Sequence, residues 1–286
     1  MPHDPFYFVT AVEAALAAGR THRQYFRHNP DIRKKGPIDL VTAADLAAED
    51  AFRGLIAARF PDHQVLGEEQ RDAVPPPRGR CRWIIDPLDG TTNFAHGLAL
   101  FCVSIALEVE GVLEIGVVYD PVGEELFVAE RGRGARVNGR PLRVSRTAVL
   151  GDALLCTGFP YTIREGQAHQ VNIFSRFLGG ARAVRRLGSA ALDLCYVAAG
   201  RFDGFWEEQL HPWDIAAGAL IVAEAGGRVT RYDDGPIDLF RGQIVASNGP
   251  LPFTAPVDTS VVAPEVRSYT SRRSSVSPGT NRSLVE

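Results

Sequence analysis

The sequence predicts a layered protein of mixed α and β structure, and two observations support this. In the first half, three β-rich runs over 101–109, 113–119 and 125–130 follow one another with short polar breaks, which predicts an antiparallel meander. In the second half, helical and strand patterns alternate over 165–246, which predicts helices layered on a sheet. We therefore expect an α+β first half followed by an α/β second half.

Two helices and a short strand are predicted at the start of the chain. Apolar residues recur at helical spacing over 6–28 and again over 43–59, where Pro61 ends the second helix. Residues 64–67 form a short apolar run typical of a strand. The segment 71–80 is rich in Pro and Gly, which predicts a loop.

The meander is preceded by one more strand and followed by a hairpin. The run 81–85 is apolar and ends at Asp86, which predicts a buried strand. Asn138-Gly139 is a dipeptide typical of tight β-hairpins.

The alternating half is predicted to hold three helices and four strands. The helices are expected over 165–178, 189–199 and 212–225, and the strands over 181–186, 203–207, 228–230 and 243–246. Beyond Val266 the chain is rich in Ser and Arg and has little to bury, so we expect disorder. The expected divisions are an N-terminal half over 1–147, a C-terminal half over 148–263 and a tail over 264–286.

Composition excludes several classes of protein. The 31 basic and 34 acidic residues give a formal charge of −3, which argues against a dedicated nucleic-acid binder. The longest apolar stretch, 215–223, is about half of what a membrane span requires, and the first residues lack a basic leader. The four cysteines form no Cys-x-x-Cys pair, so we expect buried, reduced cysteines in a cytoplasmic protein.

Common catalytic motifs are missing from the sequence. It contains no His-Glu-x-x-His, no Gly-x-Ser-x-Gly and no Gly-Lys-Ser/Thr phosphate loop, which removes the usual zinc-protease, serine-hydrolase and nucleoside-triphosphatase assignments. Gly132-Arg133-Gly134 is only part of a dinucleotide fingerprint and lies among predicted hairpins, so a turn is expected there.

The most informative segment is Asp86-Pro-Leu-Asp-Gly, which follows a predicted buried strand. We expect the chain to turn at Pro87 so that Asp89 returns beside Asp86. Two carboxylates side by side repel each other, and a divalent cation such as magnesium or manganese removes the conflict. The same residues also favour a simple surface turn, which stays open as an alternative.

Other carboxylates stand at the ends of predicted elements. Glu68 and Glu69 follow a predicted strand, and Asp214 lies at the start of an otherwise apolar helix. Asp214 alone could be a helix cap, because acidic side chains are favoured in the first turn.

Taken together, the ordered motifs resemble the inositol monophosphatase family of magnesium-dependent, lithium-sensitive phosphatases. The resemblance extends from about residue 39 to 249 and rests on four segments: Asp39-Leu-Val-Thr-Ala-Ala-Asp, Gly67-Glu-Glu, Asp86-Pro-Leu-Asp-Gly-Thr-Thr-Asn, and Trp213-Asp-Ile-Ala-Ala-Gly with Glu224-Ala-Gly-Gly. It implies the alternating α-β-α-β-α sandwich of the inositol monophosphatase and fructose-1,6-bisphosphatase type. It also implies a homodimer with no membrane association.

The resemblance further implies a set of metal ligands. Glu68, Asp86 and the carbonyl of Leu88 would hold one Mg²⁺, and Asp86, Asp89 and Asp214 would hold a second. Glu68 also resembles the ligand of a third, weaker ion. Mn²⁺ would substitute for Mg²⁺, and Li⁺ would inhibit.

Catalytic roles follow from the same motifs. Asp45 resembles the residue that hydrogen-bonds the threonine at Thr91, and this pair, with Glu68, would activate the attacking water. Gly90 lets the backbone approach closely, and the amides of Gly90 and Thr91, at the start of a predicted short helix, could bind the phosphate.

For the alcohol part of the substrate, Glu207 resembles a glutamate that binds inositol hydroxyls. Gly188, Ser189 and Ala190 resemble the loop whose backbone lines the sugar site, and Lys34 resembles a basic residue near a metal-binding loop. We expect hydrolysis of myo-inositol 1-phosphate and related sugar phosphates. Two alternatives stay open: a histidinol phosphatase or another sugar or nucleotide phosphatase of the family, and a transcription-associated protein that binds RNA polymerase or RNA.

Overall fold

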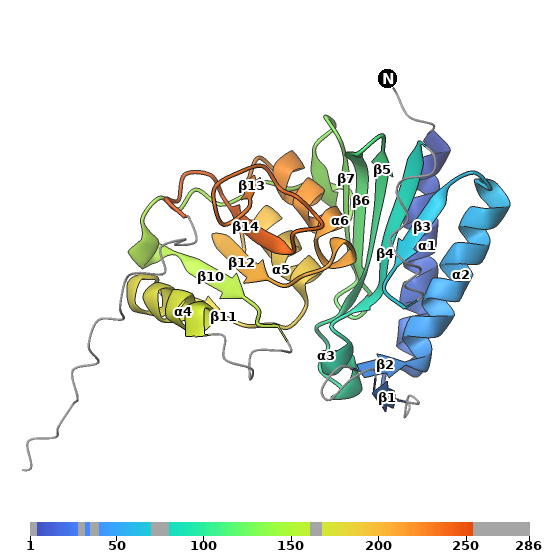
Figure 1. Cartoon of the computed structure of the whole chain (residues 1–286), viewed down its shortest axis with the longest axis horizontal. Coiled ribbons are helices and arrows are strands. Elements are labelled where there is room, and N and C mark those ends of the chain that lie inside the picture. The colour runs from blue at the N-terminus through green and yellow to red at the C-terminus, as the bar shows by residue number, and fades with distance from the viewer. Residues whose placement is uncertain (1–4, 28–31, 35–39, 70–79, 161–167, 254–286) are drawn as a thin grey trace, which may run out of the picture.

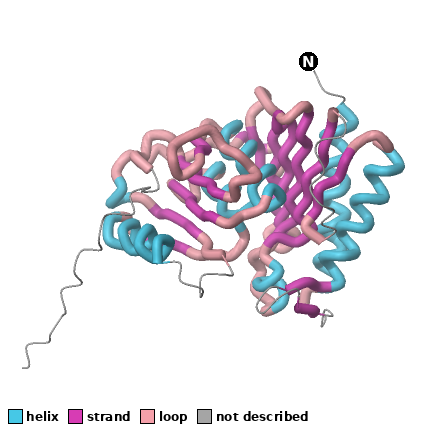
Figure 2. The backbone as a smooth tube through the Cα atoms, viewed as in Figure 1, coloured by secondary structure: helices cyan, strands magenta, loops and turns pink. Residues whose placement is uncertain are grey.

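The computed structural model describes residues 5–27, 32–34, 40–69, 80–160 and 168–253, and their helices and strands form five layers (Figure 1). The helices are α1 (Pro5–Tyr25), α2 (Ala43–Arg59), α3 (Thr91–Ala95), α4 (Ala168–Gly180), α5 (Ala190–Ala198) and α6 (Pro212–Glu224). Figure 2 shows the strands gathered into two main groups, with helices between them and on both outer sides. The layers run α1 and α2, larger sheet, α5 and α6, smaller sheet, α4, which confirms the predicted α-β-α-β-α sandwich.

The larger sheet has seven strands in the order β3-β4-β5-β6-β7-β8-β9. Their bounds are β3 (Gln64–Gly67), β4 (Cys81–Asp89), β5 (Cys102–Val109), β6 (Val112–Asp120), β7 (Glu125–Glu130), β8 (Ala135–Val137) and β9 (Arg140–Pro141). Strands β4 to β9 pair antiparallel with their sequence neighbours, which confirms the predicted meander. Asn138 and Gly139 turn the last hairpin with φ of +48° and +78°, as predicted for this dipeptide.

The smaller sheet has five strands in the order β11-β10-β12-β14-β13. Their bounds are β10 (Leu154–Thr157), β11 (Ala183–Arg185), β12 (Gly204–Glu208), β13 (Arg228–Thr230) and β14 (Gln243–Ser247). Strand β10 is parallel to both of its neighbours, so the carboxyl ends of β10, β11 and β12 share one edge. A separate pair, β1 (Ile32–Lys34) and β2 (Leu40–Thr42), precedes α2.

Two apolar cores hold the layers together. Helices α1 and α2 cover one face of the larger sheet, where Ala15 of α1 and Phe52 of α2 share an apolar cluster with Trp83 of β4. Helices α5 and α6 fill the space between the two sheets, where Leu192 and Ile221 belong to a cluster with residues of both sheets. Helix α6 is apolar on almost every side because it is covered on almost every side.

Most predicted elements are found, and several differ in detail. Helix α2 and strand β3 have the predicted bounds, whereas β1, β2 and β10 were not predicted. Helix α4 ends at Gly180, two residues beyond the predicted end at 178, and the predicted start over 165–167 lies outside the described residues. Residues 71–79 of the loop predicted over 71–80, and the predicted tail over 264–286, lie outside the described residues. No helix in the described part of the chain is long and apolar enough to span a membrane, and the four cysteines are buried and unpaired.

The expected turn at Pro87 is wrong. Strand β4 continues through Asp86, Pro87 and Leu88 to Asp89, and its register against β5 shifts between Asp86 and Asp89. Asp86 pairs with Ser104 and Asp89 pairs with Cys102. An advance of three residues along β4 therefore corresponds to only two residues along β5, so β4 contains one extra residue, as in a β-bulge. Side chains three apart on a regular strand face opposite ways, and the extra residue returns Asp89 to the face of Asp86. The two carboxylates are thus brought together by an irregular strand.

Candidate active site

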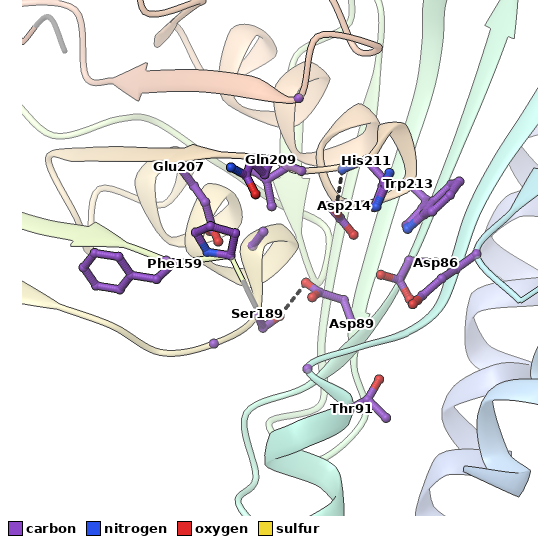
Figure 3. Close-up of a pocket in the computed structure, with 18 of the residues that line it drawn as sticks. Asp86, Asp89, Thr91, Phe159, Ser189, Glu207, Gln209, His211, Trp213 and Asp214 are labelled. Atoms are coloured by element: carbon purple, nitrogen blue, oxygen red, sulfur yellow. Dashed lines mark hydrogen bonds between the residues drawn. The ribbon is translucent and has the colours of Figure 1, made fainter. Parts of the chain in front are cut away.

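A cavity of about 540 Å³ lies where the bulge of β4 meets the ends of α5 and α6 and the carboxyl edge of the smaller sheet (Figure 3). Residues far apart in the sequence line it, from Glu68 to Gly242. Its acidic lining residues are Glu68, Asp86, Asp89, Glu207 and Asp214. The cavity therefore collects all four side chains predicted as metal ligands and the glutamate predicted to bind substrate hydroxyls.

Asp89 is fixed by the first turn of α5. Its Oδ2 accepts a hydrogen bond from the hydroxyl of Ser189 at 2.7 Å (Figure 3). The same oxygen also accepts a hydrogen bond from the backbone amide of Ala191 at 2.8 Å. Ser189 is also the N-cap of this helix, so one hydroxyl both starts the helix and holds the carboxylate. Ser189 was predicted only as part of a loop whose backbone lines the substrate site.

His22 of α1 contacts the backbone of the bulge at Pro87. The ring Nε2 lies 2.8 Å from the carbonyl oxygen of Pro87, and because a carbonyl can only accept, Nε2 carries the hydrogen. Burial lowers the pKa of His22 to about 4, so the ring is neutral in ordinary buffers. His22 could not be identified from the sequence, because nothing nearby in the chain marks a lone histidine as the partner of a residue 65 positions away.

Asp214 begins α6 and also works as a helix cap. It is the third residue of the helix, and its Oδ2 accepts a hydrogen bond of 2.6 Å from the amide of His211 (Figure 3). Both sequence interpretations of Asp214 are thus compatible, because one oxygen serves the cap while the carboxylate lines the cavity.

Thr91 and Asp45 meet at the end of the cavity near α3. The hydroxyl of Thr91 lies 3.3 Å from Oδ1 of Asp45 and 3.0 Å from the carbonyl oxygen of Leu88. The other oxygen of Asp45 accepts the backbone amide of Thr42 at 2.8 Å, which completes a capping box at the start of α2. Asp45 is fully buried, so its position is fixed by α2 and is not adjustable. The predicted contact between Asp45 and Thr91 is present.

The carboxylates around the cavity carry an electrostatic cost. Burial is the main cause that raises the pKa of Asp86 well above its ordinary range. Repulsion from Glu68, Asp89 and Asp214 raises it further. Burial likewise raises the pKa of Asp89 to about 6 and that of Asp214 well above its usual value. Within the described ranges, no lysine or arginine forms an ion pair with any of these three aspartates. A cation is the group that would relieve this repulsion.

The oxygen atoms of the site are ligands of the kind that a hard divalent cation prefers, although the described side chains do not surround a single point. Among the described residues, no three His, Cys, Asp or Glu side chains are spaced to hold a single ion together. Asp86 and Asp214 each use one oxygen for a backbone amide, from Leu88 and His211, which leaves the other oxygen of each carboxylate for a ligand. Carboxylate oxygens and a nearby carbonyl are the ligands that Mg²⁺ prefers.

The opposite side of the cavity is lined by residues of the smaller sheet and of the loop before α5. Glu207 is the next-to-last residue of β12, and its carboxylate lies so close to Gly158 that a Cβ there would overlap it. Burial raises the pKa of Glu207 to about 8. Gly188, with φ of +89°, and Ala190 line the same cavity beside Ser189.

Two further predicted site residues remain, Lys34 and Gly90. Lys34 lies on β1 opposite Leu40, and its side chain is outside the described part of the structure. Gly90, with φ of +95°, precedes α3 in the left-handed conformation and lines the cavity. The sequence analysis also missed the cavity residues Phe159, Arg186 and Arg241, whose only signal is their position beside strand ends.

Comparison with known proteins identifies the family. The family model described as "Inositol monophosphatase family" matches residues 5–270. The inositol-1-monophosphatase of Synechocystis is 46% identical over 242 residues, covering 84% of this chain and 84% of that protein. The Nus factor SuhB of Pasteurella multocida is 44% identical over 239 residues, covering 83% of this chain and 89% of the relative.

A solved structure agrees with the fold as well. The inositol monophosphatase from Anabaena superposes with a TM-score of 0.78 at 44% identity, covering 86% of this chain and 91% of that chain. The sequence motifs, the sandwich and the matches over most of the chain agree with one another. The chain belongs to the inositol monophosphatase family and is a phosphatase of that family.

Proposed function

We propose that the protein hydrolyses myo-inositol 1-phosphate and related sugar phosphates in the cytoplasm, using Mg²⁺ held in this cavity. The observation that carries the proposal is the convergence of Glu68, Asp86, Asp89 and Asp214 on one cavity with raised aspartate pKa values and no described basic ion-pair partner for the three aspartates. Proteins keep such a costly arrangement where a cation neutralises it in the working state.

The proposed ligand sets follow the sequence motifs. Glu68, Asp86 and the carbonyl oxygen of Leu88 would hold one ion, and Asp86, Asp89 and Asp214 a second. When bound, such ions lower the pKa of water and neutralise the charge that develops on phosphoryl and leaving oxygens. Two or three Mg²⁺ ions are proposed for each site, with Mn²⁺ as a substitute and Li⁺ as an inhibitor.

The protein groups would then position the nucleophile and the phosphate. Asp45 accepts a hydrogen bond from the hydroxyl of Thr91, so the threonine oxygen can in turn accept a hydrogen bond from water and orient its lone pair. Asp45 and Glu68 are the proposed acceptors of the proton that the water loses. The amides of Gly90 and Thr91 would donate to the phosphate oxygens.

The alcohol half of the substrate would lie along the smaller sheet. Glu207 and the backbone of Gly188, Ser189 and Ala190 line that side of the cavity, and we propose that they contact substrate hydroxyls. At neutral pH a carboxyl with a pKa of about 8 is mostly protonated, so Glu207 could both donate to and accept from a polyol.

Phosphate release from inositol, histidinol, fructose and adenosine phosphates, each with and without Mg²⁺, tests the proposal. We expect Mg²⁺-dependent turnover, greatest for inositol 1-phosphate, and at least a hundredfold loss in Asp214→Asn. The exposed carboxylate of Asp152, which pairs with Arg182 away from the cavity, provides the matched control Asp152→Asn. Substantial Mg²⁺-dependent activity in Asp214→Asn would exclude the ligand assignment, and a preference for histidinol phosphate would favour that alternative.

A second candidate function rests on the names of several relatives. Proteins named Nus factor SuhB are as similar to this chain as those named inositol-1-monophosphatase, which supports a proposed association with RNA polymerase or RNA. A homodimer is proposed for either role. An Asp89→Asn variant without phosphatase activity that fully complements a deletion strain would favour the transcription role, whereas failure to complement with normal expression would favour catalysis.

A further inference from the structure

Two arginines stand in the cavity on the side away from the crowded carboxylates. Arg186 follows β11 and Arg241 precedes β14, and both line the same cavity as Asp86 and Asp214. Strands β11, β10, β12 and β14 lie side by side in that order, so the two arginines stand on either side of Glu207 along one sheet edge. Ligands of α/β proteins commonly bind at this edge, where parallel strands end.

Arg186 lines the cavity with an exposed side chain. A Cβ on Gly188 would lie only 3.0 Å from its Nη1, so the guanidinium lies against the loop that starts α5. The carboxyls it faces are those of Glu207 and Asp193, and its charge lowers the pKa of both. Even so, burial raises the pKa of both carboxyls, that of Glu207 to about 8, so Glu207 is mostly protonated at pH 7 and does not neutralise Arg186. Within the described ranges, no carboxylate forms an ion pair with it.

Arg241 stands at the mouth of the cavity on a loop that is fixed at one point. The preceding residue, Phe240, also lines the cavity, and the guanidinium of Arg82 stacks 5.1 Å from its ring centroid. Arg82 is itself held by both oxygens of Glu108 at 2.9 and 2.8 Å in a buried pair. The loop therefore presents Arg241 to the cavity from a rigid support.

The charge of Arg241 is available to a ligand. Its only ion pair in the described part of the chain is with Asp238 on its own loop, at 3.5 Å, where the two side chains are 63% and 41% exposed. An exposed pair at that distance contributes little, so a better-placed anion could displace it. Guanidinium groups bind phosphate and carboxylate groups through paired hydrogen bonds.

We propose that Arg186 and Arg241 form a subsite for a second anionic group, so that a sugar phosphate with an added phosphate or carboxylate is hydrolysed more efficiently than the same sugar phosphate without it. This inference rests on the proposed function, because it assumes that the cleaved phosphate lies at the carboxylate end of the cavity. The volume of about 540 Å³ leaves room for a sugar between the two ends.

Three substrates that share the same sugar ring and differ only in the group at C6 measure the effect of a second charge. Glucose 1-phosphate has a neutral C6 hydroxymethyl group, glucuronate 1-phosphate has a carboxylate there, and glucose 1,6-bisphosphate has a phosphate. We expect kcat/KM for the two charged substrates to exceed that for glucose 1-phosphate by about tenfold or more, since a charge-assisted hydrogen bond contributes roughly this much. The two charged substrates also show whether carboxylate or phosphate is favoured.

Substitutions then locate the subsite. Arg241→Gln and Arg186→Gln should each lower the ratio of charged to neutral kcat/KM to within about twofold of one, mainly through KM. Arg185→Gln is the matched control, because Arg185 is an exposed neighbour outside the cavity, and it should leave the ratio unchanged. Arg241 is largely exposed, so Arg241→Gln tests the subsite even where Arg186→Gln folds poorly.

The outcomes distinguish this inference from the function on which it rests. A wild-type protein that hydrolyses inositol 1-phosphate with Mg²⁺ but shows no preference for the charged glucose derivatives overturns the second subsite alone. A preference that survives both arginine substitutions overturns the residue assignment. Absence of Mg²⁺-dependent hydrolysis for every substrate, inositol 1-phosphate included, overturns the proposed function itself.

Discussion

Replacing Glu207 by Gln should stabilise the metal-free protein increasingly as the pH rises. In the folded chain the pKa of Glu207 is about 8, compared with an ordinary value of 4.5. Below pH 4.5 the carboxyl is protonated in both states and contributes no difference. Between pH 4.5 and 8 the unfolded state loses the proton while the folded state keeps it, so wild-type stability falls with pH.

The size of the effect follows from the gap of about 3.5 pKa units between those two values. At 1.36 kcal/mol per unit, the full penalty is about 5 kcal/mol above pH 8. The carboxyl borders a cavity that water can enter, so we expect about half of this, ~2–3 kcal/mol. Gln is close in shape and never ionises, and it therefore removes the penalty without opening a void.

Urea unfolding of both proteins in a chelator, at half-unit steps from pH 5 to pH 8, measures the effect. The free energy of unfolding of Glu207→Gln relative to wild type should rise by ~2–3 kcal/mol across the range, with equal m-values. Glu208→Gln on the same strand is the control for loss of a carboxylate. A difference between Glu207→Gln and wild type that stays constant from pH 5 to pH 8 would refute the reasoning.

Three further substitutions test the support of the site. Thr91→Ala removes the hydroxyl bonded to Asp45, and steady-state assays should show kcat lower by about a hundredfold with a much smaller change in KM; an effect confined to KM would contradict its role in positioning water. Gly90→Ala places a Cβ 2.8 Å from the carbonyl oxygen of Leu100 in a left-handed conformation, so thermal or urea unfolding should show a loss of about 2 kcal/mol or more, and an unchanged stability would refute the close contact. His22→Phe leaves the carbonyl of Pro87 without its donor, so stability should fall by about 1–3 kcal/mol at pH 8. Because the folded pKa of His22 is about 4 while the unfolded histidine titrates at 6.5, wild-type stability rises from pH 6 to 8, and the cost of the substitution should rise by about 1 kcal/mol over that range; a cost that stays constant would contradict the low pKa.

Helices and hairpins could be predicted where the residues that specify them are neighbours in the sequence. Helix α2 was predicted at its observed bounds because Pro61 lies directly beyond its end, and the last hairpin because Asn138-Gly139 favours the left-handed conformations that it adopts. Strand β10 was missed because three apolar residues and a threonine carry too little periodicity to mark a strand that pairs with two parallel neighbours.

In the candidate site, too, features with a local sequence signal could be predicted and features that depend on distant residues could not. The acidic residues could be found from their motifs, and the structure places them around one cavity. The way Asp86 and Asp89 come together could not, because the extra residue in β4 is defined only by its register against β5. The partners that hold the site, His22 under Pro87 and Arg82 under Phe240, are distant in sequence and carry no local signal.

The two-residue strand β9 has a consequence for how copies of this protein can associate. It ends the larger sheet with exposed Arg140 and Pro141, and proline has no amide hydrogen to offer to another strand. Charge and proline at a sheet border are features that prevent strand-by-strand addition of a second molecule. The continuous hydrogen-bonded growth that leads to fibrils is therefore blocked at this border, and contact between subunits through β9 would have to rely on side chains.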